Sequence, residues 1–224
     1  WAQQLEEMHS KKGAVIPNGF DEEDYLENVT PTPKFTITYT GQTDPESRDP
    51  SPLFKAVSQL KYEGKISPTD FEVRFFGVDV ADFIPSLIRK YRLEQMVKFY
   101  GFVSFRESVK RQKESTALLL LEWNDIRGKD TFTGKIFAYL GAQRPILATG
   151  YPGGAIDKLL QESGTGILAN EVEMVKEVLR CWLEEWRRSG KIASYWKPDE
   201  NVVKRYTRRE GARKLAELLE AVST

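Results

Sequence analysis

Residues 128–150, GKDTFTGKIFAYLGAQRPILATG, contain a helical run directly before a short apolar strand. Thr133 and Gly134 precede the run KIFAYLGA, and the segment PILAT follows it. A helix that begins after small and polar residues has free backbone amides at its N-terminus, where the helix dipole favours an anion. We therefore expect the amides of residues 132–134 to form an anion site. Lys135 strengthens this expectation, because the dipole disfavours a first-turn lysine unless an anion binds close by.

Strands and helices alternate on both sides of this stretch. Apolar and β-branched runs predict six strands, at residues 34–41, 71–77, 96–101, 116–123, 145–149 and 164–169. The segments between them predict helices, and the longest, at residues 171–188, repeats apolar residues with helical spacing. This alternation predicts right-handed βαβ units and thus an α/β fold, a doubly wound parallel sheet of about six strands.

The two ends of the chain carry shorter signals. Residues 1–13 resemble the end of a helix that stops at Gly13, and residues 14–16 predict a strand of two or three residues. A Pro-Asn-Gly turn and an acidic short helix follow. Thr207 and Glu210 predict a capping box at the start of a last helix. Because the first residue is Trp rather than Met, we expect the chain to be a piece of a longer protein.

The composition excludes several classes of function. Lys and Arg together number 33, as do Asp and Glu, so no nucleic-acid partner is expected. One Cys and one His exclude a disulfide framework within the chain and a Cys/His metal site, and no metal is expected. The longest apolar run, ALLLL, is too short to span a bilayer, and no export signal is found. The expected location is the cytoplasm.

Ligands of an open parallel sheet bind beyond the carboxyl ends of its strands. The residues at those positions include several glycines, which allow a ligand to approach the backbone closely. They are Gly41 and Gln42, Gly77, Gly101 to Val103, Glu122 to Asp125, and Thr149 to Gly154. Neither the G-x-G-x-x-G pattern after the first strand nor the P-loop lysine motif is present, so the signatures of NAD and ATP sites are missing.

Four segments together resemble the C-terminal half of the retaining, group 1 (family 4) GT-B glycosyltransferases. They follow one another in the family's order, and the resemblance extends over almost the whole chain. VIPNGFD (15–21) is similar to the family's hinge motif, and FTITYTGQ (35–42) to its first strand with the glycine loop below the donor phosphates. VKFYGFVSFRES (97–108) is similar to its nucleobase segment. TGKIFAYLGAQRPILAT (133–149) resembles its KlfEYlaaGrPila run.

The resemblance implies a Rossmann-like domain that binds a nucleotide-sugar donor, with no metal or other cofactor. Gly41, Gln42, Thr133, Gly134 and Lys135 would line the donor diphosphate. Phe102 and Val103 fall in the nucleobase segment, and Gly77 and Glu122 at the other strand ends. Arg48 is either a further cation for the phosphates or a surface arginine. Amides and cations of this kind can stabilise the charge that develops on a leaving diphosphate.

Ala138 departs from the family pattern. The family commonly has there the second glutamate of a Glu-x7-Glu pair, which accepts hydrogen bonds from the ribose. The first position of the pair is Asp130, which either faces the sugar or is a polar loop residue. Losing a charge-assisted hydrogen bond costs on the order of 1.5–3 kcal/mol. Either another residue, Glu122 or Asp125, reaches the ribose, or the donor binds weakly, or sugar transfer has been lost.

The resemblance divides the chain into three parts. Residues 1–33 would be an interdomain hinge and lead-in helix, residues 34–198 the donor-binding domain, and residues 199–224 a C-terminal helix that crosses to a missing N-terminal acceptor domain. The implied activity is transfer of a hexose to a glycan or another acceptor, as in polysaccharide biosynthesis. The isolated piece would be inactive, and any peripheral membrane association would involve only the missing domain.

Two other functions remain open. One is a non-catalytic module, descended from such an enzyme, that binds a sugar nucleotide or a glycan; Ala138 favours it. The other is half of a GT-B-like epimerase or phosphorylase, which would require a catalytic histidine or a cofactor lysine.

Overall fold

The structure is a computed structural model that describes residues 2–11 and 13–223. Its centre is a six-stranded sheet in the order β3-β2-β1-β4-β5-β6, with every pair of neighbours parallel. The predicted α/β fold and the strand count are therefore confirmed. The strands are β1 (Phe35–Thr40), β2 (Phe71–Phe76), β3 (Val97–Phe99), β4 (Ala117–Leu121), β5 (Ile146–Thr149) and β6 (Gly166–Leu168).

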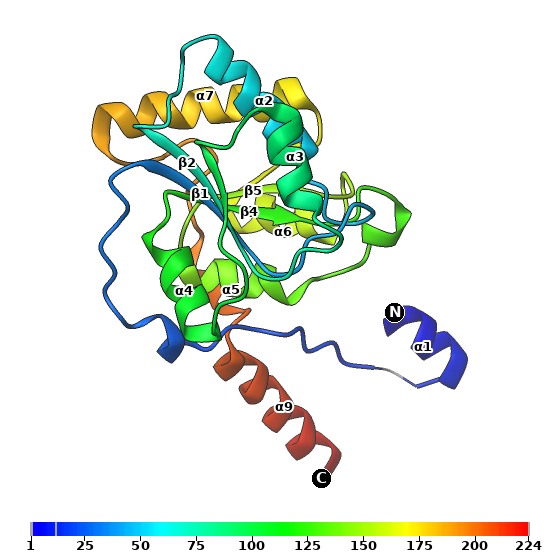
Figure 1. Ribbon diagram of the computed structural model, residues 1–224. Helices are drawn as coiled ribbons and strands as arrows, with labels where there is room; N and C mark the ends of the chain where they lie inside the picture. Colours follow the sequence, from blue (N-terminus) through cyan, green and yellow to red (C-terminus); the bar gives the residue numbers. More distant parts are fainter. Residues whose placement is uncertain (1, 12, 224) are drawn as a thin grey trace.

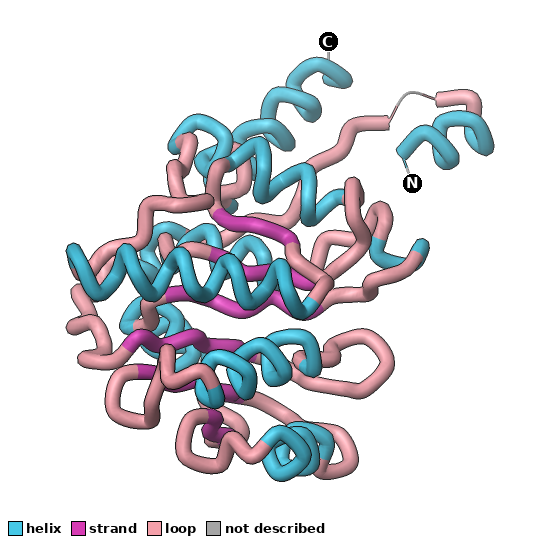
Figure 2. The backbone as a smooth tube through the Cα atoms, turned by 90° about the horizontal axis from the view of Figure 1, so that it is seen from above, coloured by secondary structure: helices cyan, strands magenta, loops and turns pink. Residues whose placement is uncertain are grey.

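Helices cover both faces of the sheet (Figure 1). On one face, α2 (Ser51–Tyr62), α3 (Phe83–Tyr91) and α7 (Val172–Ser189) pack in one hydrophobic cluster. Figure 2 looks onto this face, where the long helix α7 crosses in front of the strands. On the other face, α5 (Gly134–Ala142) and α6 (Ala155–Ser163) form a second cluster, and α4 (Phe105–Glu114) lies beside α5.

The central strand β4 explains why its sequence is an uninterrupted apolar run. Leu119 and Leu121 belong to the first cluster, whereas Leu118 and Leu120 belong to the second. Successive side chains of a strand point to opposite faces. Because helices cover both faces here, each residue of β4 needs an apolar side chain.

The order of the strands places a switch point between β1 and β4. From β1 the chain proceeds outward to β2 and β3, and from β4 it proceeds outward in the other direction to β5 and β6. The connections after β1 and β4 therefore diverge, which opens a crevice at the carboxyl ends of these two strands. The short β1–β4 ladder, Ile37 with Ala117 and Thr38 with Leu118, is the seam beneath it.

The N-terminal region differs in part from its prediction. Helix α1 (Ala2–His9) ends before Gly13, and residues 14–16 form no strand. The pairing instead occurs at Phe20, which forms a parallel bridge with Thr207. The amide of Phe20 donates to the carbonyl of Tyr206 (3.0 Å), and the amide of Arg208 donates to the carbonyl of Phe20 (2.8 Å). The acidic short helix is present as η1 (Glu22–Tyr25).

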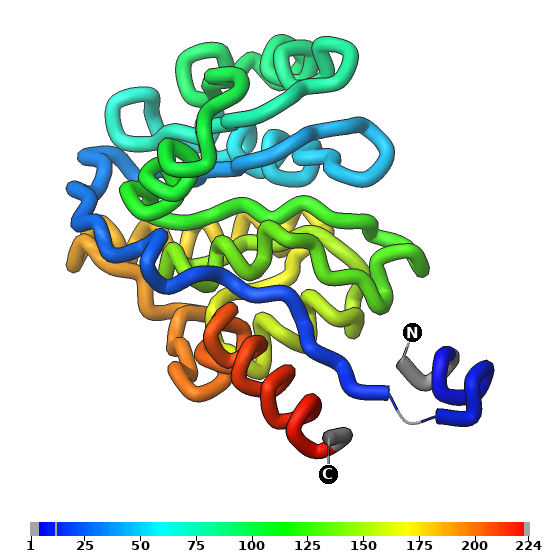
Figure 3. The backbone as a smooth tube through the Cα atoms, turned by 90° about the horizontal axis from the view of Figure 1, so that it is seen from below, coloured from blue at the N-terminus to red at the C-terminus, as the bar shows by residue number. Residues whose placement is uncertain are grey.

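The C-terminal region contains one short helix that the sequence did not indicate, α8 (Glu200–Lys204), capped by Asp199. The last helix, α9 (Arg208–Ser223), begins after Thr207, whose hydroxyl accepts from the amide of Glu210 at 3.2 Å, as predicted for a cap. Figure 3 shows the N-terminal segment crossing beside the start of α9, which projects from the body. None of the described helices is long and apolar enough to cross a membrane.

Candidate functional site

Glycines tie together the loops that follow β1, β2 and β3. The amide of Gly41 donates to the carbonyl of Phe76, and that of Gly77 to the carbonyl of Gly101, each at 2.8 Å. Gly77 has φ +141°, and a Cβ atom there would lie 2.0 Å from the carbonyl oxygen of Gly41. Only glycine allows this approach. The three loops therefore form one continuous backbone ledge at the carboxyl edge of the sheet.

Lys135 extends along this ledge from the first turn of α5. A Cβ atom on Gly41, which has φ +131°, would lie 2.5 Å from the Cε of Lys135, so the lysine stem fills the space that the glycine leaves. The ammonium lies 5.6 Å from the centroid of the Tyr39 ring. The Lys135 side chain is only 16% exposed. Burial lowers its pKa, although the charge of Glu122 opposes the shift.

Glu122 follows β4 and lies opposite Lys135 across the switch point. Its Oε1 lies 3.8 Å from the Lys135 Nζ, and its side chain is 8% exposed. Burial raises the pKa of the carboxyl, although the charges of Lys135 and Arg48 and the Thr133 hydroxyl oppose the shift. Glu122, directly after β4, and Lys135, in the first turn of α5, thus form a buried pair of opposite charges in the crevice.

Arg48 is the second cation of this cluster. Its Nη1 donates to the Oδ2 of Asp44 at 3.0 Å within the β1–α2 loop. Its positive charge acts to lower the pKa values of Glu122, Lys135 and Tyr39. Its Nε is buried and has no hydrogen-bond partner within the described residues. The structure thus brings Arg48 to the crevice, with one edge of the guanidinium neutralised by Asp44.

The N-terminus of α5 is capped by Thr133, whose hydroxyl accepts from the amide of Lys135 at 3.4 Å. The cap therefore occupies one first-turn amide. Gly134 is exposed, and a Cβ atom there would meet nothing within 4 Å. The backbone of Gly134 is accordingly open to a ligand that approaches the helix end.

The other predicted site residues lie at different distances from this cluster. Gln42 is exposed, and its carbonyl accepts from the Tyr39 hydroxyl at 2.5 Å. Phe102 is 81% exposed and Val103 half-buried, both after β3, two strands away from β1. Asp130 is exposed in the loop before α5 and makes no ion pair within the described ranges. The structure therefore groups Gly41, Lys135, Glu122 and Arg48, but not Asp130.

Ala138 lies one turn further along α5. It is partly buried against the second hydrophobic cluster, to which Phe20 and Tyr25 also pack. Its position is thus apolar here. Room for the N-terminal segment comes from Gly141, where an added Cβ atom would lie 2.6 Å from the Tyr25 ring.

The sequence did not indicate two tyrosines that shape the crevice. Tyr39 and Tyr139 are fully buried. The Tyr139 hydroxyl accepts from the amide of Thr40 at 3.1 Å, and burial raises its pKa to about 12. In the sequence, only the position of Tyr39 near the end of a strand and that of Tyr139 inside a buried helix could have indicated them. Both tyrosines look like ordinary core residues there.

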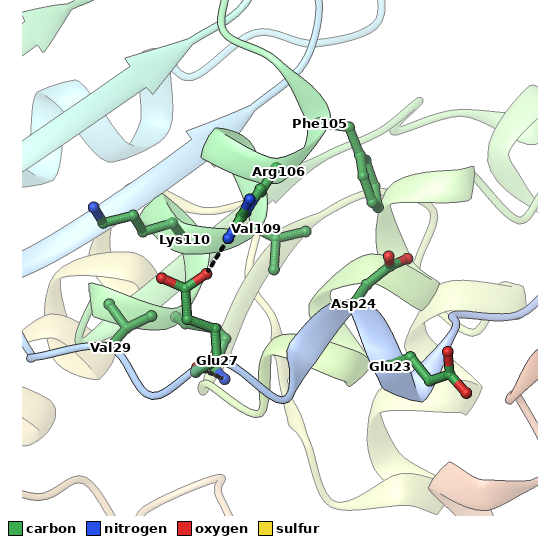
Figure 4. A pocket seen from close by; sticks show the side chains of 9 residues that line it. Glu23, Asp24, Glu27, Val29, Phe105, Arg106, Val109 and Lys110 are labelled. Atoms are coloured by element: carbon green, nitrogen blue, oxygen red, sulfur yellow. Dashed lines mark hydrogen bonds and ion pairs between the residues drawn. The ribbon is translucent and has the colours of Figure 1, made fainter.

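Among the described residues, two hollows are found away from the switch point. One, of about 320 Å³, lies between η1 and α4, where Arg106 pairs with Glu27 at 3.3 Å (Figure 4). The other, of about 1010 Å³, is an open groove along α6, β6 and residues 193–197. No group of three or more His, Cys, Asp or Glu side chains in the described ranges could hold a metal ion.

Comparisons by sequence find no match, either among protein-family models or among curated proteins. Comparison of folds finds similar solved structures. HepE from Anabaena, solved in complex with UDP, superposes with a TM-score of 0.69 at 19% identity, over 93% of this chain and 57% of HepE. A glycosyltransferase from Rickettsia africae gives 0.68 at 16% identity, over 99% of this chain and 61% of that protein.

A third similar structure is a separate domain. It is the C-terminal domain of LpcC, a group 1 glycosyltransferase from Francisella tularensis, with a TM-score of 0.55 at 14% identity, over 85% of this chain and 93% of that domain. The chain thus spans about six tenths of the HepE and Rickettsia proteins. At these identities the likeness establishes the fold, and the chain has the α/β fold found in the C-terminal half of GT-B glycosyltransferases.

Proposed function

We propose that the chain is the donor-binding half of a retaining glycosyltransferase that transfers a hexose from a nucleotide sugar to a glycan or another acceptor. The observation that carries this proposal is the meeting of Lys135, Arg48 and the N-terminus of α5 at the switch point of the sheet. HepE, which has the same fold there, was solved with UDP and with UDP-glucose.

The donor diphosphate would lie on the Gly41–Gly77 ledge. Lys135 and the edge of Arg48 that Asp44 leaves free would face its oxygens, and Gly134 would offer its backbone. When the bond to the sugar breaks, negative charge grows on the leaving diphosphate. Preorganised cations in a site shielded from water stabilise that charge without reorganising. The chemistry proposed for these residues requires no metal ion.

The acceptor would bind to a domain outside this chain. Leu215 and Leu218 on the projecting helix α9 are 50% and 38% exposed, which suits a helix that packs against such a domain. The chain alone is accordingly expected to bind donors but to transfer little sugar. A cytoplasmic location belongs to the same proposal.

A specific observation favours a second candidate, a non-catalytic module that binds a sugar nucleotide. Ala138 packs into the second cluster and cannot accept a hydrogen bond, and Asp130 lies outside the charged cluster. Transferase activity of the longer protein would exclude this candidate, whereas donor binding without turnover would support it.

Calorimetric titration with UDP, GDP, ADP and dTDP tests donor binding. We expect one nucleotide to bind and Lys135→Met to weaken it about tenfold to a hundredfold, as for loss of a charge-assisted interaction. Lys129→Met, in the exposed loop before α5, is the matched control and should bind like the wild type. If no nucleotide binds at millimolar concentration, or both variants behave alike, the proposed site is wrong.

A further inference from the structure

One oxygen of the Glu122 carboxylate is buried without a hydrogen-bond partner. The side chain is 8% exposed, and its Oε1 has no partner within the described residues. The nearest ammonium, that of Lys135, is 3.8 Å away, beyond hydrogen-bond distance. A buried acceptor left without a donor is costly, and such groups usually have a partner. The position of Glu122 therefore indicates a donor that a ligand supplies.

The neighbouring carboxylates do not share this property. Asp125 accepts from the Nε of Arg127 at 2.9 Å and 3.0 Å and caps η2 (Ile126–Gly128) through the Arg127 amide. Hydrogen bonds from Arg127 lower its pKa to about 2. Asp44 is likewise bound, to Ser47 and Arg48. Among the described carboxylates of this crevice, Glu122 is thus the one that remains available to a ligand.

The surroundings of Glu122 restrict the chemistry of that ligand. Lys135 and the buried, partnerless Nε of Arg48 favour anionic oxygens, as does the N-terminus of α5. An anionic oxygen directly against Glu122 would be repelled. The ligand must therefore place a neutral donor on the carboxylate and anionic oxygens a few ångströms away. A phosphate ester of a polyol has this arrangement, because its hydroxyl groups lie close to the phosphate.

We propose that Glu122 accepts a hydrogen bond from a hydroxyl group of the bound nucleotide sugar and so selects polyol diphosphates over other diphosphates. The hydroxyl belongs either to the ribose or to the transferred hexose, both of which are polyols esterified to phosphate. This inference rests on the proposed donor site, and it gives the crevice an acceptor that Ala138 does not supply.

The test compares ligands with and without hydroxyl groups in Glu122→Gln. Calorimetry measures the affinity of four ligands. They are inorganic pyrophosphate, whichever of UDP and GDP binds more tightly, the 2′-deoxy form of that nucleotide, and the glucose ester of that nucleotide. Glutamine has the same shape and no charge, so the variant should fold. Pyrophosphate should bind as well or better, because a negative charge near the anion is gone. The hydroxyl-bearing ligand should bind about tenfold more weakly, as expected when a charge-assisted hydrogen bond is lost.

The individual arms identify the hydroxyl. If it is the ribose 2′-hydroxyl, the 2′-deoxy nucleotide should be weak in the wild type and no weaker in Glu122→Gln. If it belongs to the hexose, only the glucose ester should lose affinity. Asp125→Asn, the control, should change none of these ratios.

Two results would overturn the inference. In the first, the wild type binds the nucleotide, but Glu122→Gln changes the affinities for the nucleotide and for pyrophosphate by the same factor. Glu122 then acts only through its charge, and the proposed donor site is unaffected. If the wild type binds no nucleotide at all, the donor site and this inference both fail.

Discussion

Gly77→Ala should destabilise the protein through a contact that can be read from the structure. At φ +141° an L side chain is strained, which costs on the order of 1–3 kcal/mol. Its Cβ would also lie 2.0 Å from the carbonyl oxygen of Gly41, a backbone atom that can give way only if the ledge moves. Forced overpacking of this kind costs about 1–3 kcal/mol more. The expected total is about 2–6 kcal/mol, and a chain of this length loses roughly 2–4 °C of melting temperature per kcal/mol.

Gly64→Ala is the matched control. Gly64 has φ +68° in the turn after α2, and an added methyl group would meet nothing within 4 Å, so only backbone strain applies. That strain is about 1–2 kcal/mol. Urea unfolding of the two variants isolates the clash as their difference. If Gly77→Ala were no more destabilised than Gly64→Ala, the close contact between the two loops would be refuted, and with it the ledge proposed to hold the diphosphate.

Three further outcomes are expected. Lys135→Met removes the cation that opposes the raised pKa of Glu122. The stabilisation from a raised carboxyl pKa is fully present below the unfolded value near 4.5 and is lost as the pH rises through the folded pKa. Thermal scans should therefore show a larger loss of stability above pH 4.5 than in the wild type, and adding Glu122→Gln should abolish the difference. Gly134→Ala should leave the melting temperature unchanged or higher, yet weaken pyrophosphate binding in calorimetry, since the added methyl group points into open space; unchanged binding would place the anion elsewhere. Tyr139→Phe should cost about 1–3 kcal/mol in urea unfolding by leaving a β1 amide unpaired, whereas Tyr62→Phe, at a side chain 94% exposed, should cost nothing; equal effects would contradict the bond to Tyr139.

The fold could be predicted because its signals are local. A run such as ALLLL requires helices on both faces, and the hydroxyl of Thr207 marks the start of α9 within one residue. The predicted strand at residues 14–16 was wrong for the complementary reason. A strand needs a neighbouring strand with which to pair. The backbone at Thr207, which could serve as that neighbour, lies beside Phe20 and not beside residues 14–16. No local pattern carries that information.

The candidate site was predictable as a set of positions but not as a set of contacts. The rule that ligands bind at strand ends pointed to Gly41, Gly77 and Glu122. It could not show that the stem of Lys135 fills the space above Gly41, or that Asp44 holds one edge of Arg48. Those facts depend on side-chain positions set by the packed loops. Their pairing, rather than the residues alone, distinguishes Glu122 from Asp125 as the available acceptor.

The bridge between Phe20 and Thr207 has a mechanical consequence. Two segments from opposite ends of the chain meet there through two backbone hydrogen bonds, one on either side of Phe20. Tension applied between the two ends would first load this Phe20–Thr207 bridge, which acts as a clasp between the two segments. It would load the sheet only after the segment before β1 had detached. Under traction the protein should therefore lengthen in two stages: a small, reversible extension as the clasp opens, followed by rupture of the parallel sheet at much higher force.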